Sequence, residues 1–229
     1  MYLVAESLPR TRLVVDVPRS VRRPSSTRSL YPVAKRTTDV AAAGLMLIVL
    51  APLFALIALI IKLTDGGSIF FVQRRVGRDG QEFPFYKFRS MVPNAEALKA
   101  KLLAENDHGN SVTFKMKRDP RITPIGRLLR RTSLDELPQL WNVLRGDMSL
   151  VGPRPAVPAE VAKYTLNQRR RLGVTPGLTC LWQVSGRGNL PFDRQVELDL
   201  HYIANRSWTY DLKLMLRTIP AVVTGRGAY

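Results

Sequence analysis

Two adjacent carboxylates, Asp135 and Glu136, lie in the stretch SLDELPQLWN at residues 133–142, and arginines such as Arg130 and Arg154 flank them on both sides. Neighbouring acids would repel a phosphate unless a divalent cation joined them, and Mg²⁺ typically binds one or two carboxylates together with substrate phosphates. Arginine forks and helix amino ends bind phosphate oxygens. These residue types at this spacing therefore indicate a metal–diphosphate site.

A purely structural explanation of the same acids stays open beside this one. Ser133 and Glu136 have the spacing of a capping box, in which both side chains satisfy backbone amides at a helix start. Asp135 would then complement the helix dipole. In this alternative, Ser133 caps a helix. Pro138 would fall inside that helix, where it removes a hydrogen bond, so capping alone does not explain the stretch.

Other reactive side chains are few. Cys180 is the only cysteine, so an internal disulfide is excluded, and a buried thiol is the expectation. His108 and His201 are isolated from any Cys or His cluster, which argues against zinc.

The net charge of +17 on 229 residues predicts polyanionic partners, namely anionic lipid headgroups, phosphorylated substrates or nucleic acid. A hydrophobic content of 45% indicates a folded chain. Nucleic acid is not expected, because the sequence shows no reading element or aromatic-lined basic groove.

An uninterrupted apolar run of 21 residues extends over 41–61, which is long enough to enter a bilayer as a helix. A fully buried globular helix is the alternative. Pro52 stands in the middle of the run, so we expect a small, supported bend there. Both flanks are rich in Arg and Lys, which favour the cytoplasmic side. A re-entrant helix that leaves on its side of entry is preferred over a spanning one.

Simple patterns predict the elements that position these residues. Apolar segments at 69–72 and 83–88 flank the turn GRDG and predict a β-hairpin. Helices are expected at 94–106 and 122–131, and loops with short strands at 174–189. Residues 193–223 predict two helices broken at 205–207, the second with a stripe of Leu212, Leu216 and Ile219. This stripe faces either a membrane interface or the core.

Several ordered motifs then resemble one family. They are KRTTD (35–39) with the apolar run, KFRSM (87–91), the long segment at 121–155, PGLTCLWQVSGR (176–187) and LDLHYIANRSWTYDL (198–212). From Lys35 to the C-terminus the chain resembles the bacterial sugar transferases, the monotopic phosphoglycosyl transferases, in their minimal form.

The resemblance implies an α+β fold. A re-entrant N-terminal helix hairpin would anchor it to the membrane, with interfacial amphipathic helices and a small β-hairpin around one catalytic domain. The expected divisions are a basic segment at 1–34 that is disordered or lies on the membrane surface, the membrane helix at 35–62, and the catalytic domain at 63–229. The family often has Ser-Pro at the hairpin break, where this chain has Ala51-Pro52.

The resemblance also implies an activity: transfer of a sugar-1-phosphate from a UDP-sugar to a polyprenyl phosphate with Mg²⁺, releasing UMP, on the cytoplasmic face of the bacterial inner membrane. Asp135 would be the nucleophile and Glu136 its metal-linked partner. The implied phosphate or nucleotide contacts, each also explicable as a surface charge or salt bridge, are Lys87 (for which Arg89 could substitute), Arg130, Arg154, Arg187 and Asp199. The donor sugar and the oligomeric state, including a homo-oligomer, stay open.

A non-catalytic membrane scaffold that holds anionic lipid with its basic face is the alternative from a different functional class. It predicts no dependence on Mg²⁺ and no effect of changing Asp135.

Overall fold

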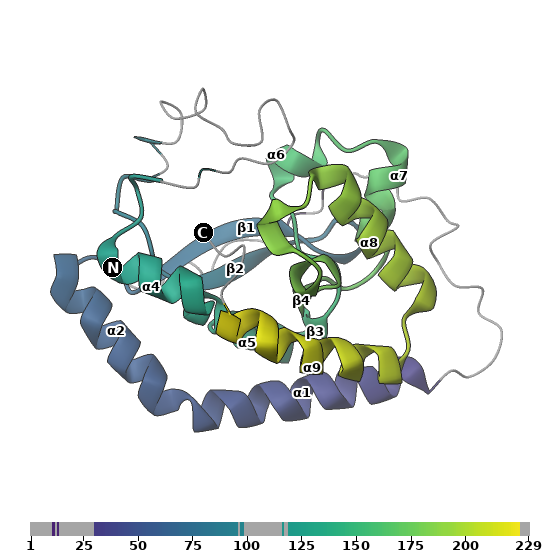
Figure 1. Ribbon diagram of the computed structural model, residues 1–229, viewed down its shortest axis with the longest axis horizontal. Helices are drawn as coiled ribbons and strands as arrows, with labels where there is room; N and C mark the ends of the chain where they lie inside the picture. The colour runs from purple at the N-terminus through teal and green to yellow at the C-terminus, as the bar shows by residue number, and fades with distance from the viewer. Residues whose placement is uncertain are drawn as a thin grey trace.

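The computed structural model describes residues 11, 13, 30–95, 97–98, 116 and 119–224. Its described elements mix helices and 3-10 turns (η) with two small sheets, in agreement with the predicted α+β class (Figure 1). In chain order they are α1 (Tyr31–Val49), α2 (Ala51–Asp65), β1 (Phe70–Val76), η2 (Arg78–Gly80), β2 (Glu82–Phe88), α4 (Pro124–Thr132), η4 (Leu134–Glu136), α5 (Gln139–Arg145), β3 (Ser149–Val151), α6 (Pro158–Val161), α7 (Leu166–Arg169), η5 (Arg170–Gly173), β4 (Gly177–Thr179), η6 (Trp182–Val184), η7 (Arg187–Asn189), α8 (Phe192–Asn205) and α9 (Trp208–Thr224).

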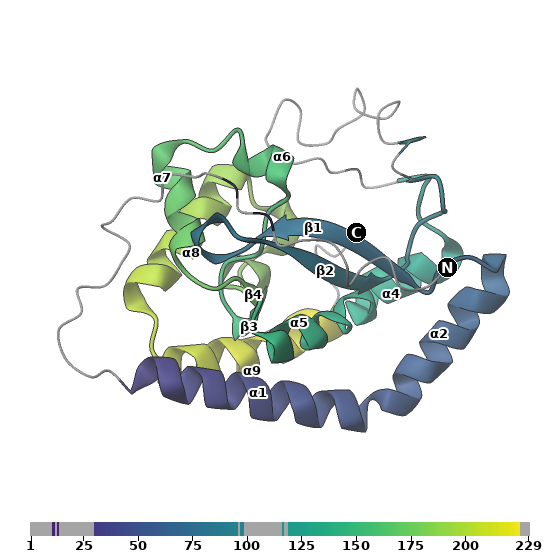
Figure 2. The ribbon, with the colours of Figure 1, turned by 180° about the vertical axis from the view of Figure 1, so that it is seen from behind.

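α1 and α2 form a bent pair along one side of the molecule, and Figures 1 and 2 both show α2 leaving the end of α1 at an angle. The bend is 60°. It is larger than the small one expected, because the first helix ends at Val49 and a second begins at Ala51. Pro52 therefore lies in the first turn of α2, where its missing N–H group costs no helical hydrogen bond.

Among the described residues, α1 and α2 are the only candidates for a membrane-inserted segment. No single described helix is both long and apolar enough to cross a bilayer, whereas α1 and α2 pass the same test when taken together. Along α1 only Asp39 and Ala43 are buried. The apolar side chains of Ile48, Leu59 and Leu63 are more than half exposed.

Polar contacts tie the beginning of α1 to the core. The Lys35 ammonium donates to the carbonyl of Val151 (2.9 Å), and the Arg36 guanidinium donates to the last carbonyls of α5. The Asp39 carboxylate accepts the N–H of Leu150 (2.9 Å). Lys35 and Asp39 of α1 thus form hydrogen bonds with backbone groups of β3, as a neighbouring strand would.

The predicted β-hairpin is confirmed. β1 and β2 are antiparallel, with Phe70 opposite Phe88 and Arg75 opposite Phe83. The turn between them uses Asp79 and Gly80, both with positive φ. Because side chains alternate along a strand, Arg75, Phe85 and Lys87 share one face of the hairpin.

The second sheet is a short parallel pair, β3 and β4, next to the central core. Gly152 and Gly177 allow the two backbones to approach, since a Cβ on Gly177 would collide with the Gly152 amide nitrogen. Most buried residues of the central cluster come from α1, β2, α5, β3, α8 and α9, and they include Phe85, Leu140, Val143 and Leu214; Met148 joins them from the loop before β3.

The two C-terminal helices are confirmed, with their break at residues 206–207. In α9, Leu214 is fully buried, whereas Leu212, Leu216 and Ile219 are 40%, 59% and 61% exposed. The stripe therefore faces outward, which excludes the core-facing alternative. In the predicted helix 94–106, residues 95, 97 and 98 are helical, and the rest lies outside the described residues.

Candidate functional site

The acid pair lies in a sharp corner between α4 and α5. Ser133 has φ +57° and ends α4, and its side chain makes no capping hydrogen bond. The predicted capping box is therefore wrong. Asp135 and Glu136 occupy the 3-10 turn η4, and α5 begins only after Pro138, whose missing N–H is harmless at that position. The left-handed serine turns the chain, so the helix that Ser133 would have capped does not form.

Glu136 is held by two cations that arrive from different elements. Lys87, near the end of β2, donates to its Oε1 atom at 2.7 Å. Arg154, in the loop after β3, donates from Nη2 to Oε1 at 2.7 Å and from Nη1 to Oε2 at 3.4 Å. This fork against a carboxylate fixes both side chains in one orientation.

Asp135 is more deeply buried and less well compensated. It is 5% exposed. Its closest ion-pair contact among the described residues is with the Lys87 ammonium, 3.8 Å from Oδ2, which is too long for a hydrogen bond. Lys87 therefore faces both carboxylates but binds only Glu136 tightly.

These surroundings move the pKa values of the two acids in opposite directions. Burial raises the pKa of Asp135, and this effect outweighs the opposing charge of Lys87. Burial acts in the same sense on Glu136, but Arg154 and Lys87 together lower the pKa of that carboxyl far below its ordinary value. Adjacent acids whose pKa values separate in this way are suited to different chemical roles.

Two further predicted residues lie near the pair. Arg130, on α4, donates from Nε to the Ser90 hydroxyl (2.9 Å), and its charge acts on Asp135. Arg187 has a positive φ of 51°, and its charge acts on Glu136. The Nη1 atom of Arg187 is buried and has no hydrogen-bond partner among the described residues.

The structure separates the other two predicted residues from this centre. Arg89 lies against Gly67, where an added Cβ would collide with its guanidinium, so Lys87 and not Arg89 is the residue beside the acids. Asp199 is 1% exposed on α8 and bound by Arg171, whose Nε and Nη2 atoms lie 2.8 and 2.6 Å from Oδ2. Burial raises the pKa of Asp199 to about 6 in spite of Arg171.

The sequence interpretation missed Arg75. Its Nη1 atom donates to the carbonyl of Pro155 (3.0 Å), and its guanidinium lies 5.1 Å from the centre of the Phe85 ring. Burial and the nearby Arg154 lower the pKa of Arg75 to about 10. The hairpin register could have revealed it, because Arg75 shares a strand face with Lys87.

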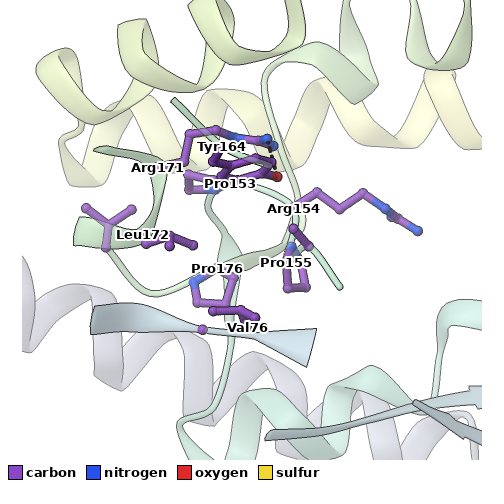
Figure 3. Close-up of a pocket in the computed structure, with 11 residues that line it drawn as sticks. Val76, Pro153, Arg154, Pro155, Tyr164, Arg171, Leu172 and Pro176 are labelled. Carbon is purple, nitrogen blue, oxygen red and sulfur yellow. Dashed lines mark hydrogen bonds between the residues drawn. The ribbon is translucent and has the colours of Figure 1, made fainter. Parts of the chain in front are cut away.

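A small cavity lies behind the loop that carries Arg154 (Figure 3). Its lining includes Val76, Pro153, Tyr164 and Arg171, and its volume of about 10 Å³ holds roughly one water molecule. Figure 3 shows the Arg154 side chain extending away from the residues around this cavity. The cavity thus belongs to the packing behind the loop and is too small for a substrate.

The acid pair supplies carboxylate oxygens as possible metal donors. Within the part of the chain that the structure describes, no group of three or more His, Cys, Asp or Glu side chains is placed to hold a metal ion. Two adjacent carboxylates are nevertheless the set with which proteins hold Mg²⁺ when substrate phosphates complete the coordination.

Known proteins share most of this chain. The model of the family described as bacterial sugar transferase matches residues 30–225. The chain is 43% identical over 212 residues to the exopolysaccharide production protein ExoY of Sinorhizobium fredii (strain NBRC 101917 / NGR234), covering 90% of this chain and 94% of that protein.

Two longer relatives match a similar stretch. The galactosyl transferase CpsE of Streptococcus agalactiae serotype III is 49% identical over 199 residues, covering 86% of this chain and 43% of that protein. The undecaprenyl-phosphate galactose phosphotransferase of Salmonella typhimurium is 46% identical over 199 residues, covering 85% and 41%. The chain thus spans less than half of these two proteins. The chain belongs to the bacterial sugar transferase family.

Proposed function

We propose that the chain transfers a sugar-1-phosphate from a UDP-sugar to a polyprenyl phosphate and releases UMP, as the first membrane step of a bacterial glycan such as an exopolysaccharide. The observation that carries the mechanism is the pair Asp135 and Glu136, whose pKa values are moved apart within a ring of cations. The names of the relatives, which include an exopolysaccharide production protein and an undecaprenyl-phosphate galactose phosphotransferase, support the same reaction class.

Asp135 is the proposed nucleophile. One of its carboxylate oxygens attacks the β-phosphorus of the UDP-sugar, the bond from that phosphorus to the bridging oxygen breaks, and UMP departs with the electron pair. An oxygen of polyprenyl phosphate then attacks the phosphorus of the aspartyl phosphosugar, the bond from that phosphorus to the Asp135 oxygen breaks, and the carboxylate is regenerated. Dividing one transfer into two displacements is the advantage of covalent catalysis.

Glu136 and the cations position the reactants. Lys87 and Arg154 keep Glu136 ionised and fixed, and their remaining donors, with those of Arg130 and Arg187, suit the diphosphate oxygens. Neutralising the charge on the leaving UMP lowers the barrier for its departure.

Mg²⁺ is the proposed cofactor, held by Asp135 and Glu136. The residues fit, because Asp135 has oxygen lone pairs that no hydrogen bond occupies among the described residues, while Glu136 would exchange part of its pairing with Lys87. When bound, Mg²⁺ neutralises charge on the diphosphate.

The membrane arrangement proposed here is re-entrant. The bent pair α1 and α2 enters the inner membrane from the cytoplasmic side and returns to it, and the exposed stripe of α9 lies at the interface. The net charge of +17 favours anionic headgroups on the same face. The acceptor and the intermediate then meet at one boundary, which supplies proximity.

Trapping the intermediate tests the mechanism. The protein is incubated with labelled UDP-galactose and Mg²⁺ without acceptor, and the peptide containing Asp135 is examined by mass spectrometry. We expect a phosphosugar adduct there, and loss of both adduct and UMP release in Asp135→Asn. Asp79→Asn, a turn position where Asn also tolerates positive φ, is the control. An active wild-type preparation without an adduct would contradict the mechanism, and a panel of UDP-sugars would identify the donor.

A further inference from the structure

Two residues ahead of the family match pair with the outer edge of the hairpin. The N–H of Glu82 donates to the carbonyl of Thr11 (2.9 Å), and the N–H of Leu13 donates to the carbonyl of Gly80 (3.0 Å). The numbering rises along one partner while it falls along the other, so the pairing is antiparallel. This is strand addition at a sheet edge, made by a segment outside the matched residues 30–225.

Side chains reinforce this pairing. The Thr11 hydroxyl donates to Oε2 of Glu82 (2.9 Å) and accepts from Nη1 of Arg74 (2.8 Å). Arg74 also donates to Glu82 (3.1 Å), which closes a ring of three polar residues. Leu13 is partly buried against the cluster that contains Val76. Two backbone bonds, a polar ring and an apolar contact thus fix Thr11 and Leu13 at this edge.

The opposite edge of the hairpin, on β1, is bonded to the loop that carries Arg154. The N–H of Val76 donates to the carbonyl of Ala156 (2.8 Å), and Arg75 donates to that of Pro155 (3.0 Å). Ala156 belongs to the same cluster as Val76, against which Leu13 packs. The path from Leu13 to Arg154 therefore runs through direct contacts.

We propose that the segment containing Thr11 and Leu13 is an intramolecular strap that positions Arg154 and Lys87 against Glu136. It covers the turn end of the outer edge of β2, and the Asn142 side chain bonds the next part of that edge at Pro84 and Tyr86. A two-stranded hairpin by itself is only marginally stable in water, and an uncovered edge is open to other pairing. One strand of that hairpin carries Lys87, and the other is bonded to the Arg154 loop. The kinetic part of this inference rests on the proposed function, whereas the docking itself does not.

A disulfide tests the docking. Thr11 and Glu82 lie opposite each other with their side chains in contact, so the double variant Thr11→Cys, Glu82→Cys should form an in-chain disulfide on mild oxidation. Peptide mass spectrometry under non-reducing conditions measures it. The single variants are controls, with the buried native Cys180 common to all of them. Absence of the disulfide, or a disulfide between two chains, would overturn the inference.

Hydrogen exchange tests the transmission to the Arg154 loop. Leu13→Pro removes the donor to Gly80 and the apolar contact, whereas Leu13→Met keeps both. We expect the Val76 amide to exchange about fivefold faster in the proline variant. The reason is that the loss of roughly one hydrogen bond lowers the free energy of local opening at this edge. Amides of α5 serve as the internal reference. Equal exchange at Val76 in both variants would overturn the positioning role.

Kinetics provide the readout that a purely structural role would not change. Leu13→Pro should lower kcat for UMP release about fivefold with KM changed by less than about twofold. In an Arg154→Lys background the same change should have little further effect, because both changes act through one contact. Full additivity of the two variants would overturn the link to Arg154. Since the disulfide and exchange measurements need no substrate, failure of the strap is distinguishable from failure of the proposed reaction.

Discussion

At the scale of single residues, the adjacent acids Asp135 and Glu136 differ in how closely cationic side chains approach them. Among the described residues, Glu136 has three contacts of 2.7 to 3.4 Å with Lys87 and Arg154, whereas Asp135 has one ion-pair contact, at 3.8 Å, with Lys87. The nearby cations stabilise the ionised form of Glu136 and lower its pKa. Burial disfavours the ionised form of Asp135 and raises its pKa. A carboxylate whose charge is not neutralised by neighbours is the better nucleophile of the two.

Changing Arg154 to Lys should lower the rate of sugar-phosphate transfer by roughly tenfold or more. Lysine keeps the charge but cannot reproduce the fork against both oxygens of Glu136, and a charged hydrogen bond contributes about 1.5–3 kcal/mol. Steady-state UMP release measures it. Arg194→Lys, in an exposed pair with Glu197, is the matched control and should retain the wild-type rate. Equal rates in the two variants would remove Arg154 from the site.

The raised pKa of Asp135 predicts a pH dependence of the reaction. The reactive form is ionised, so kcat/KM should fall as the pH drops through the pKa of the free enzyme, and this fall should lie above the ordinary value of 3.8. Fixed-time assays of UMP release between pH 4 and pH 8 measure kcat/KM, and circular dichroism confirms that the protein stays folded over this range. A profile of kcat/KM that stays flat from pH 8 down to pH 4 would show that Asp135 is not the titrating nucleophile.

At the scale of elements, the beginning of α1 acts as a structural brace for β3. Within the described part of the chain, β3 has one strand neighbour, β4, and the Asp39 carboxylate accepts the N–H of Leu150 on β3. Lys35 likewise donates to the Val151 carbonyl. Since Arg154 follows β3 after two residues, the placement of this strand sets the reach of Arg154 toward Glu136.

Removing the Asp39 acceptor should therefore destabilise the fold. Asp39→Ala leaves the buried Leu150 N–H without its partner, a cost of about 1–3 kcal/mol, so the melting temperature should fall by several degrees. Differential scanning fluorimetry in detergent measures the change. Asp39→Asn keeps an acceptor oxygen and should recover most of the loss. If alanine and asparagine melt alike, this hydrogen bond does not support β3.

At the scale of the whole molecule, apolar surface is gathered on α1, α2 and α9. Figures 1 and 2 show α9 lying alongside α1, with the bent pair along the same side of the molecule. Contiguous exposed apolar surface of this kind typically marks an interaction with a partner or a membrane. Figures 1 and 2 place β1 and β2 on the side of α5 and α9 that faces away from α1.

The re-entrant arrangement predicts that both ends of the bent pair are accessible from one side. Leu30, which is 79% exposed, and the exposed Ser68 flank the pair and can each be replaced by cysteine. An impermeant thiol reagent should label both only after the cytoplasmic face is opened. Wild-type protein, with its single buried Cys180, gives the background. Labelling of position 30 and position 68 from opposite faces would establish a spanning helix instead.

The sequence determined the local elements and the chemical composition of the site. Alternation and the turn dipeptide specified the hairpin, and periodicity specified α4, α8 and α9, because these patterns depend on neighbours within a few residues. The break near Pro52 and the adjacency of the two acids were likewise local. The motifs also sufficed for the family, which the match over residues 30–225 confirms.

Only the tertiary structure decided which charges meet. Lys87 and Arg89 are equivalent in sequence, but the strand ends at Phe88, and only Lys87 faces the acids. Asp199 is bound by Arg171 away from them, and Arg75 joins the Arg154 loop through the hairpin register. Ser133 ends α4 in a left-handed conformation, and its side chain does not cap the turn that follows. Long-range pairing and burial set these outcomes, and no short window of sequence contains them.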